Sequence, residues 1–122
     1  MFISSRGVNY HVQVIGEGEP IVFLHGFTGS VETWYQVIKS FQKNYKCVLI
    51  DIIGHGMTDC PDDYSRYLIE KVAKDIIYIL DVLAIPKAHI VGYSMGGRLA
   101  LATAILYSTR ILSLILESSS PG

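Results

Sequence analysis

The chain has few charged residues, a weak net charge and no long apolar segment. Charged residues make up 17% of its 122 positions, and the formal net charge is −1. So weak a charge offers little electrostatic attraction for nucleic acid or for an anionic membrane surface. No stretch approaches the ~20 apolar residues that a membrane-spanning helix needs, and the N-terminal residues lack the apolar segment of a secretory signal. We therefore expect no nucleic acid and no membrane among the partners of this protein.

Cysteine is scarce as well, with only two in the chain. Cys47 falls in a strand-like run and Cys60 in a loop, and their spacing is not that of metal ligands. Isolated thiols in a chain without a secretory signal are typical of a reducing compartment. The sequence therefore predicts a cytoplasmic protein, and it offers no candidate for a metal site.

Apolar residues, in contrast, account for 50% of the sequence, which fits strands buried on both faces of a parallel sheet. Apolar periodicity and turn residues predict the order of the elements. They are a hairpin of strands at 2–5 and 8–15, a strand at 21–24, a helix at 30–43, a strand at 46–50, a helix at 66–83, a strand at 88–91, a helix that runs to about 107, and a strand at 111–116. Such an order is typical of a single α/β domain with a mostly parallel sheet and helices on both faces.

Three of these segments carry more specific expectations. Ser30 is a suitable N-cap for the first helix. The serine-rich residues 118–122, which end on Pro-Gly, predict a loop. In the helix at 66–83 the spacing predicts one apolar face, made of Leu68, Ile69, Val72, Ile76, Ile79, Leu80 and Leu83.

The most informative segment is Gly92-Tyr93-Ser94-Met95-Gly96, which lies between a β-branched run and a segment rich in helix formers. Gly-x-Ser-x-Gly between a strand and a helix is typical of a nucleophile elbow, a turn so tight that its serine has a strained backbone. Glycines on both sides let the two backbones pass closely. The alternative is a glycine-rich turn in which Ser94 only caps a helix. The context favours the elbow, and we predict that Ser94 is a catalytic residue.

A second glycine-rich turn, Leu24-His25-Gly26-Phe27-Thr28-Gly29, leaves the strand predicted at 21–24. In enzymes with such an elbow, an N–H of this turn and the N–H that follows the nucleophile bind an oxyanion together. Here the two donors would be the backbone amides of Phe27 and Met95. The alternative is an ordinary strand-to-helix loop. A phosphate-binding loop is disfavoured because no Gly-Lys-Ser/Thr follows.

Two further residues are candidates for the substrate site. Arg98 lies one helical turn after Ser94, where its guanidinium could bind a carboxylate through paired hydrogen bonds. A plain surface arginine is an equally good interpretation of this spacing. His25 adjoins the predicted oxyanion turn, and we expect it to shape that turn and to contribute to the substrate site. The remaining histidines are expected to be structural or at the surface, namely His11, His55 and His89.

Three motifs together resemble the N-terminal half of α/β-hydrolase-fold proteins, and the resemblance covers essentially the whole chain. They are Leu24-His25-Gly26-Phe27-Thr28-Gly29-Ser30, Asp51-Ile52-Ile53-Gly54-His55-Gly56 and Val91-Gly92-Tyr93-Ser94-Met95-Gly96-Gly97-Arg98. The Phe-Thr-Gly-Ser turn and the Tyr-Ser-Met-Gly-Gly-Arg segment are similar, more narrowly, to those of the MenH family. That family makes 2-succinyl-6-hydroxy-2,4-cyclohexadiene-1-carboxylate in menaquinone biosynthesis. The α/β-hydrolase fold is therefore the expected fold.

The resemblance implies a lyase that eliminates pyruvate from an enolpyruvyl cyclohexene precursor, with no metal or organic cofactor. It implies that Ser94 is the serine of a catalytic triad and that the amides of Phe27 and Met95 form the oxyanion hole. It also implies that Tyr93 and Arg98 line a pocket for a small-molecule carboxylate substrate. The same motifs serve carboxylic-ester hydrolases, so a serine hydrolase is the alternative.

The chain departs from this pattern after the serine. Elbow enzymes place the triad in the order serine, acid, histidine, but no histidine follows Ser94, and Glu117 is the one carboxylate that does. We expect Glu117 to be structural. A serine without an adjacent base is a weak nucleophile. The strand predicted at 111–116 would also form an open apolar edge, which invites pairing with another chain.

We therefore expect residues 1–122 to be the N-terminal part of a single α/β-hydrolase domain, truncated after the sixth strand and inactive by itself. The missing C-terminal half, or a second copy of the chain, would cover the open edge. A non-catalytic half-domain that self-associates through this edge is the third interpretation.

Overall fold

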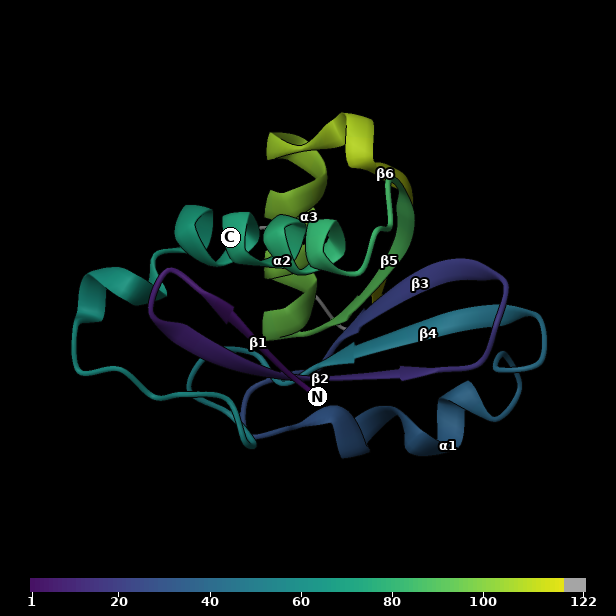
Figure 1. Ribbon diagram of the computed structural model, residues 1–122, viewed down its shortest axis with the longest axis horizontal. Coiled ribbons are helices and arrows are strands. Elements are labelled where there is room, and N and C mark those ends of the chain that lie inside the picture. Colours follow the sequence, from purple (N-terminus) through teal and green to yellow (C-terminus); the bar gives the residue numbers. More distant parts are fainter. Residues whose placement is uncertain (118–122) are drawn as a thin grey trace.

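A computed structural model describes residues 1–117, in which six strands form one sheet in the order β1-β2-β4-β3-β5-β6 (Figure 1). The strands are β1 Phe2–Ser5, β2 Val8–Ile15, β3 Glu19–Leu24, β4 Tyr45–Ile50, β5 Ala88–Tyr93 and β6 Ile111–Glu117. β2 pairs antiparallel with β1 and β4, whereas β4, β3, β5 and β6 run parallel to one another. The mostly parallel sheet expected from the sequence is confirmed. The loop expected at 118–122 lies outside the described residues.

The N-terminal hairpin has its predicted bounds, and its turn shows why. Arg6 and Gly7 have φ angles of 44° and 83°. A two-residue turn with positive φ at both positions has the twist that the flanking antiparallel strands require. This turn places Ser5 opposite Val8 and so sets the register of β1 on β2.

Helices cover both faces of the sheet (Figure 1). α2 (Ile69–Val82) and α3 (Met95–Leu106) pack on one face, and the short helices η1 (Val31–Trp34) and α1 (Tyr35–Ile38) pack on the other. A last short helix, η3 (Ser108–Arg110), leads from α3 into β6. None of the helices within residues 1–117 is long and apolar enough to cross a membrane.

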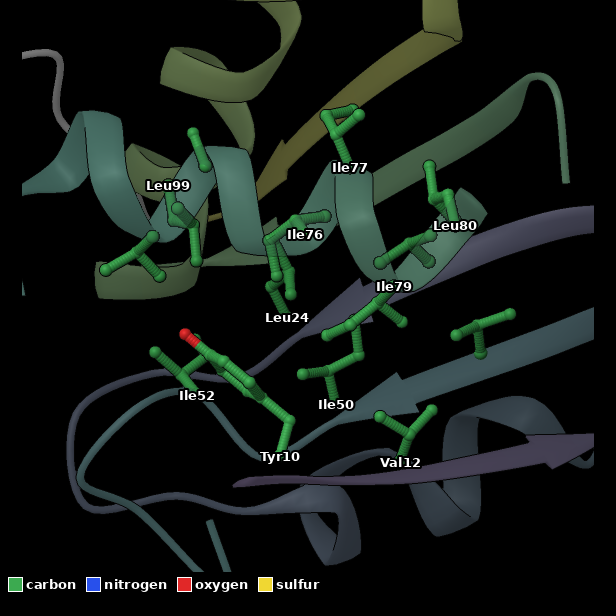
Figure 2. Close-up of a cluster of buried hydrophobic side chains, with 14 of the residues drawn as sticks. Tyr10, Val12, Leu24, Ile50, Ile52, Ile76, Ile77, Ile79, Leu80 and Leu99 are labelled. Carbon is green, nitrogen blue, oxygen red and sulfur yellow. The ribbon is translucent and has the colours of Figure 1, made fainter. Parts of the chain in front are cut away.

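The central strands β3 and β4 are buried on both sides, because alternate side chains point to opposite faces. Toward α2 and α3 they present Val22, Leu24, Val48 and Ile50, and toward η1 and α1 they present Ile21, Phe23, Cys47 and Leu49. Figure 2 shows the larger cluster, with Leu24 and Ile50 of the sheet facing Ile76 and Ile79 of α2. Burial on both sides accounts for the unbroken apolar runs in the sequence.

The helix predicted at 30–43 is wrong in length. Ser30 does cap it, since its Oγ accepts a hydrogen bond from the Glu32 N–H at 3.2 Å. The helical part ends at Ile38, however, and the chain then passes through turns into β4. Gly18 lies so close to the Asn44 carbonyl that a Cβ there would overlap it. This contact lies where the chain enters β4, and helical periodicity cannot reveal it.

The helix predicted at 66–83 begins later, at Ile69. Leu68 has a ψ of 134°, and the chain before it forms the 3-10 helix η2 (Tyr64–Tyr67). Leu68 and Ile69 are 47% and 42% exposed, so their expected place on the buried face is wrong. The later positions of that face are buried as expected, namely Val72, Ile76, Ile79 and Leu80, with Leu83 partly buried.

A buried carboxylate joins α2 to the N-terminal hairpin. Asp75 on α2 is fully buried and accepts hydrogen bonds from Ser5 Oγ and Tyr10 OH, each at 2.6 Å. The Arg6 guanidinium lies 2.6 Å from its Oδ1, and the Arg66 guanidinium lies 2.7 Å from its Oδ2. Burial, together with the bond to Asp75, raises the pKa of Tyr10, which keeps the phenol a donor. The buried charge is tolerated because both of its oxygens have partners.

Removing the charge of Asp75 should therefore destabilise the fold strongly. We expect Asp75→Asn to lower the free energy of unfolding by about 3–5 kcal/mol, because the largely buried Arg66 guanidinium would lose its counter-ion. The matched change Glu70→Gln, at an exposed position of the same helix, should cost less than about 1 kcal/mol. Urea denaturation of the two variants measures both values, and equal losses would contradict this role for Asp75.

Candidate active site

The turn between β5 and α3 is as sharp as the sequence predicts. Ser94 stands between the last residue of β5 and the first of α3, with φ 54° and ψ −112°. A positive φ is uncommon for a residue with a side chain, and such strain gathers at functional sites. The Ser94 carbonyl accepts hydrogen bonds from the N–H groups of Gly97 and Arg98, at 2.9 and 3.2 Å, so the helix starts immediately after the serine.

Two glycines let α3 start where it does. A Cβ on Gly92 would lie 2.6 Å from the Gly97 Cα, and a Cβ on Gly96 would overlap the carbonyl oxygens of Leu24 and His25. Contacts that close do not occur between real atoms, so the helix backbone rests directly on the ends of β5 and β3. The strained Ser94 backbone follows from this close approach.

The turn after β3 lies against the serine. A Cβ on Gly26 would lie 3.4 Å from the Ser94 Cβ and 2.8 Å from the Tyr93 ring. Within residues 1–117, the hydrogen bonds leave the N–H groups of Phe27 and Met95 without an acceptor. The first N–H groups of a helix have no acceptor inside the helix and favour negative charge. The two amides assigned to an oxyanion hole are therefore both available as donors near this turn.

His25 is fully buried behind the oxyanion turn. Its Nδ1 lies 2.7 Å from the Gly26 carbonyl, and its Nε2 lies 3.0 Å from the Ile52 N–H. Burial lowers the pKa of this ring, which favours the neutral form. With both nitrogens engaged and no exposed surface, His25 does not contact a substrate, and the part of our expectation that placed it in the substrate site is wrong. Its expected effect on the shape of the turn agrees with these contacts.

A second buried carboxylate ties the neighbouring loops together. Asp51 follows β4, and its Oδ1 accepts a hydrogen bond from the Val31 N–H at 2.7 Å. Its Oδ2 accepts one from the Met57 N–H at 2.9 Å and lies 2.8 Å from His11 Nδ1 on β2. These bonds join β2 to the loops after β3 and β4, where the site is built. His11 is thus structural, as expected.

A cavity of about 440 Å³ borders the Phe27 and Met95 side of the turn. Its wall is mostly apolar, formed by Ile52, Ile53, Ile69, Val72 and Leu99. Of the described residues that line the cavity, Arg98 alone carries a permanent charge. Arg98 thus borders the cavity and is also exposed to solvent. Tyr93 does not line this cavity, since its half-exposed ring lies against Gly26.

Among the lining residues that were not expected in the site, three have polar side chains. His55, Cys60 and Tyr67 come from the long loop after β4 and from η2. His55 Nδ1 lies 3.1 Å from the Ile53 carbonyl, as a structural role predicts, but its ring also packs 5.6 Å from that of Phe27. The hydrogen bond to Cys60 raises the pKa of Tyr67 to about 12. Cys60 and Tyr67 belong to no motif, and His55 lies in the Asp51–Gly56 motif, where a structural role was expected; the fold of the loop brings all three to the cavity.

None of the hydrogen bonds described for residues 1–117 joins a histidine ring to Ser94. The same part of the chain contains no group of three or more His, Cys, Asp or Glu side chains able to hold a metal ion. What the described residues do assemble is a strained serine, two amide donors and a largely apolar cavity with one cation.

Comparison with known proteins places this geometry in context. A family model described as alpha/beta hydrolase fold matches residues 19–122. The chain is 41% identical over 120 residues to a Bacillus subtilis (strain 168) protein provisionally named 2-succinyl-6-hydroxy-2,4-cyclohexadiene-1-carboxylate synthase, covering 97% of this chain and 43% of that protein. It is 33% identical over 116 residues to Homo sapiens epoxide hydrolase 4, covering 93% of this chain and 32% of that protein.

A solved structure with the same arrangement is that of Est816, described as an N-acyl homoserine lactone degrading enzyme. It matches with a TM-score of 0.92 at 33% identity, over 98% of this chain and 45% of that one. The chain therefore spans less than half the length of these relatives.

The strain at position 94 can be measured by comparing two truncations of the same side chain. Both Ser94→Ala and Ser94→Gly remove the hydroxyl, but only glycine adopts a positive φ without a steric cost. We expect Ser94→Gly to be more stable than Ser94→Ala by about 1–2 kcal/mol in denaturant unfolding. At Ala102, inside α3, the order should reverse, and Ala102→Gly should lose about 1 kcal/mol. Equal stability of the two Ser94 variants would mean that the turn is unstrained.

Proposed function

The chain belongs to the alpha/beta hydrolase fold family, and from that premise we propose that the whole protein is a cofactor-free lyase. The proposed reaction eliminates pyruvate from an enolpyruvyl cyclohexene precursor and forms 2-succinyl-6-hydroxy-2,4-cyclohexadiene-1-carboxylate. The observation that carries the proposal is the pairing of two available amides beside Ser94 with a cavity whose one permanent charge is Arg98. The identity of 41% to the Bacillus subtilis protein supports this choice of reaction.

The first chemical step suits the two amides. Removal of a proton from the carbon next to a carbonyl leaves the electron pair delocalised onto the carbonyl oxygen. Donors already aimed at that oxygen stabilise the charge without having to reorganise, and removal of one such donor typically costs about 10²–10³-fold in rate. The electron pair then forms the new carbon–carbon double bond as the carbon–oxygen bond to the enolpyruvyl group breaks. The departing enolate takes up a proton on its methylene carbon and becomes pyruvate. Neither step needs a metal ion.

Ser94 would take part in the proton transfer, in contact with the substrate. A serine hydroxyl is a weak base at neutral pH and needs an adjacent group to activate it. We propose that an acid and a histidine outside residues 1–117 complete the triad, since elbow enzymes place both after the serine. We also place the enzyme in the cytoplasm, on the strength of its two unpaired thiols, Cys47 and Cys60.

Arg98 would recognise a carboxylate of the substrate. Arg98 lines the cavity near the start of α3, close in sequence to the amide of Met95. Arginine binds carboxylates through two parallel charge-assisted hydrogen bonds, which fix orientation as well as position. A substrate with a carboxylate at one end and an apolar ring in the middle fits a wall made mainly of isoleucine, valine and leucine.

A carboxylic-ester hydrolase is the second candidate, and the same amides favour it. The tetrahedral intermediate of ester hydrolysis also places negative charge on a carbonyl oxygen. Epoxide hydrolase 4 and Est816 are named for hydrolytic or degrading activities, so the shared fold does not choose between the two chemistries. Rapid turnover of short p-nitrophenyl esters, without release of pyruvate from the enolpyruvyl precursor, would favour the hydrolase.

We propose further that the remaining part of the same domain covers the β6 edge of the sheet. Within residues 1–117, β6 pairs with β5 alone, and its other edge is open. The strand exposes apolar side chains, namely Leu112, Ile115 and Leu116. An open edge of this kind templates pairing with other chains unless something covers it. Relatives more than twice as long supply enough chain for that purpose.

Kinetics of the whole protein test the lyase assignment. We expect Ser94→Ala to lower kcat for pyruvate release by about 10³-fold or more, because the activated group is lost. Arg98→Ala should raise KM by roughly 10- to 100-fold through the loss of charge-assisted hydrogen bonds, with Arg98→Lys in between. Arg110→Ala serves as the control, because Arg110 is paired with Asp81 and does not line the cavity. Absence of pyruvate from the unmodified protein would end the lyase proposal.

Sedimentation of the 122-residue chain tests the open edge. We expect this chain to self-associate, and Ile115→Lys to weaken the association by roughly tenfold or more, because one exposed apolar side chain of the edge becomes charged. Val37→Lys, at a comparably exposed position of α1, should leave the association unchanged. A monomeric unmodified chain would contradict the need for a cover and would also remove the non-catalytic, self-associating half-domain from consideration.

A further inference from the structure

The peptide between Gly26 and Phe27 is held from its carbonyl side. The Gly26 carbonyl oxygen lies 2.7 Å from His25 Nδ1 and accepts a second hydrogen bond from the Gly29 N–H at 3.0 Å. In a trans peptide the C=O and N–H bonds lie in one plane and point in opposite directions. A carbonyl fixed by two donors therefore fixes the direction of the Phe27 N–H, which points away from His25.

The protonation state of the His25 ring follows from its second contact. The Ile52 N–H is 3.0 Å from Nε2, and a backbone N–H can only donate. Nε2 must then be the accepting, unprotonated nitrogen, so the proton of the neutral ring is on Nδ1. Nδ1–H is in turn the donor to the Gly26 carbonyl. Only this tautomer makes both bonds at once.

The surroundings of the ring favour the neutral form. The ring has no exposed surface, and burial lowers its pKa, with a smaller lowering from His55. The His55 ring packs 5.1 Å from it, from the loop after β4. The Gly26 carbonyl and the Asp51 carboxylate act in the opposite direction and do not outweigh burial. In the part of the chain that the structure describes, His55 and Asp51 are the charged or titratable groups that act on His25.

We infer that His25 is a positioning residue of the oxyanion hole, which orients the Phe27 N–H through the Gly26 carbonyl and does so only as the neutral Nδ1–H tautomer. The inference rests on the proposed role of the Phe27 amide. His25 touches no substrate in this role. It joins the oxyanion turn after β3 to Ile52 in the wall of the cavity, so the donor and the wall keep one relative position.

Protonation of His25 would break the hydrogen bond between its Nε2 and the Ile52 N–H. A proton on Nε2 would face the Ile52 N–H, and two donors cannot share a hydrogen bond. The loop after β4 would then move away from the ring, and the positive charge would lie close to His55. We therefore expect the site to lose its geometry in acid before the rest of the sheet unfolds.

Two amide substitutions separate the two contacts of the ring. In His25→Asn the side-chain N–H₂ can occupy the place of Nδ1 and still donate to Gly26, whereas in His25→Gln the longer side chain reaches the place of Nε2 and can accept from Ile52. In the whole protein we expect His25→Gln to lower kcat by about 10²–10³-fold with little change in KM, because the misplaced donor acts on the transition state. His25→Asn should stay within about tenfold of the unmodified kcat. His89→Asn is the matched control, because His89 lies at the start of β5, away from Ser94, and this change should leave kcat unchanged.

The outcomes distinguish this inference from the proposed function. Equal kcat values for His25→Asn and His25→Gln would overturn the positioning role, even if Ser94→Ala is inactive. An active Ser94→Ala would overturn the proposed function instead. A merely structural role for His25 predicts similar losses in both variants, because each variant keeps one of the two hydrogen bonds.

A measurement on the unmodified protein covers the case in which the variants fail to fold. Because the folded pKa of His25 is lowered, the folded state binds this proton less readily than the unfolded chain. The contribution of His25 to stability is then complete above pH ~6.5, and it is lost as the pH drops from there toward the pKa of the folded state. Over that range the equilibrium constant for unfolding rises by up to about tenfold per pH unit. In NMR titration over this range, the Phe27 amide resonance should move with the midpoint of the His25 ring. A Phe27 amide that does not respond while the ring titrates would overturn the inference.

Discussion

Contact between backbones at the start of α3 governs the geometry of the site. Gly96 of the helix lies directly against the carbonyl oxygens at the end of β3. On the side of β5, the absence of a side chain at Gly92 lets the helix backbone approach equally closely. Since no side chain fits between these backbones, the chain must reverse within one residue. Ser94 absorbs the reversal in its positive φ. The same contact places the first amides of the helix beside the turn after β3, so the strained serine and the two donors are consequences of a single packing constraint.

Buried polar groups then hold the loops around this point of contact. His25 joins the turn after β3 to the loop after β4, and Asp51 joins both loops to β2. These groups lie beyond the carboxyl ends of parallel strands, where open α/β sheets place their binding sites. Loops carry exposed backbone and few apolar contacts, so hydrogen bonds to buried side chains are what fix them. Asp75 likewise joins α2 to the N-terminal hairpin through hydrogen bonds from Ser5 and Tyr10.

Both proposed reactions develop negative charge on a carbonyl oxygen of the substrate. Elimination through an enolate and hydrolysis through a tetrahedral intermediate both place negative charge where two amides can receive it. The substrate, more than the fold, separates the two reactions. The proposal of an anionic substrate with an apolar body rests on Arg98, the permanently charged residue among the described lining residues, and on the apolar wall. Within residues 1–117, β6 is the last strand of the sheet and pairs with β5 alone.

The sequence by itself determined whatever depends on neighbours along the chain. The hairpin turn at Arg6-Gly7, the buried strands, the sharp turn at Ser94 and the glycine-rich turn after β3 are all local patterns, and the structure contains each of them. Tertiary contacts alone decided the rest. The first helix ends at Ile38, before the turns that lead into β4. His25 is fully buried, with both ring nitrogens hydrogen-bonded within the protein. Periodicity and motifs describe one segment at a time, whereas these features depend on which distant segment packs against it.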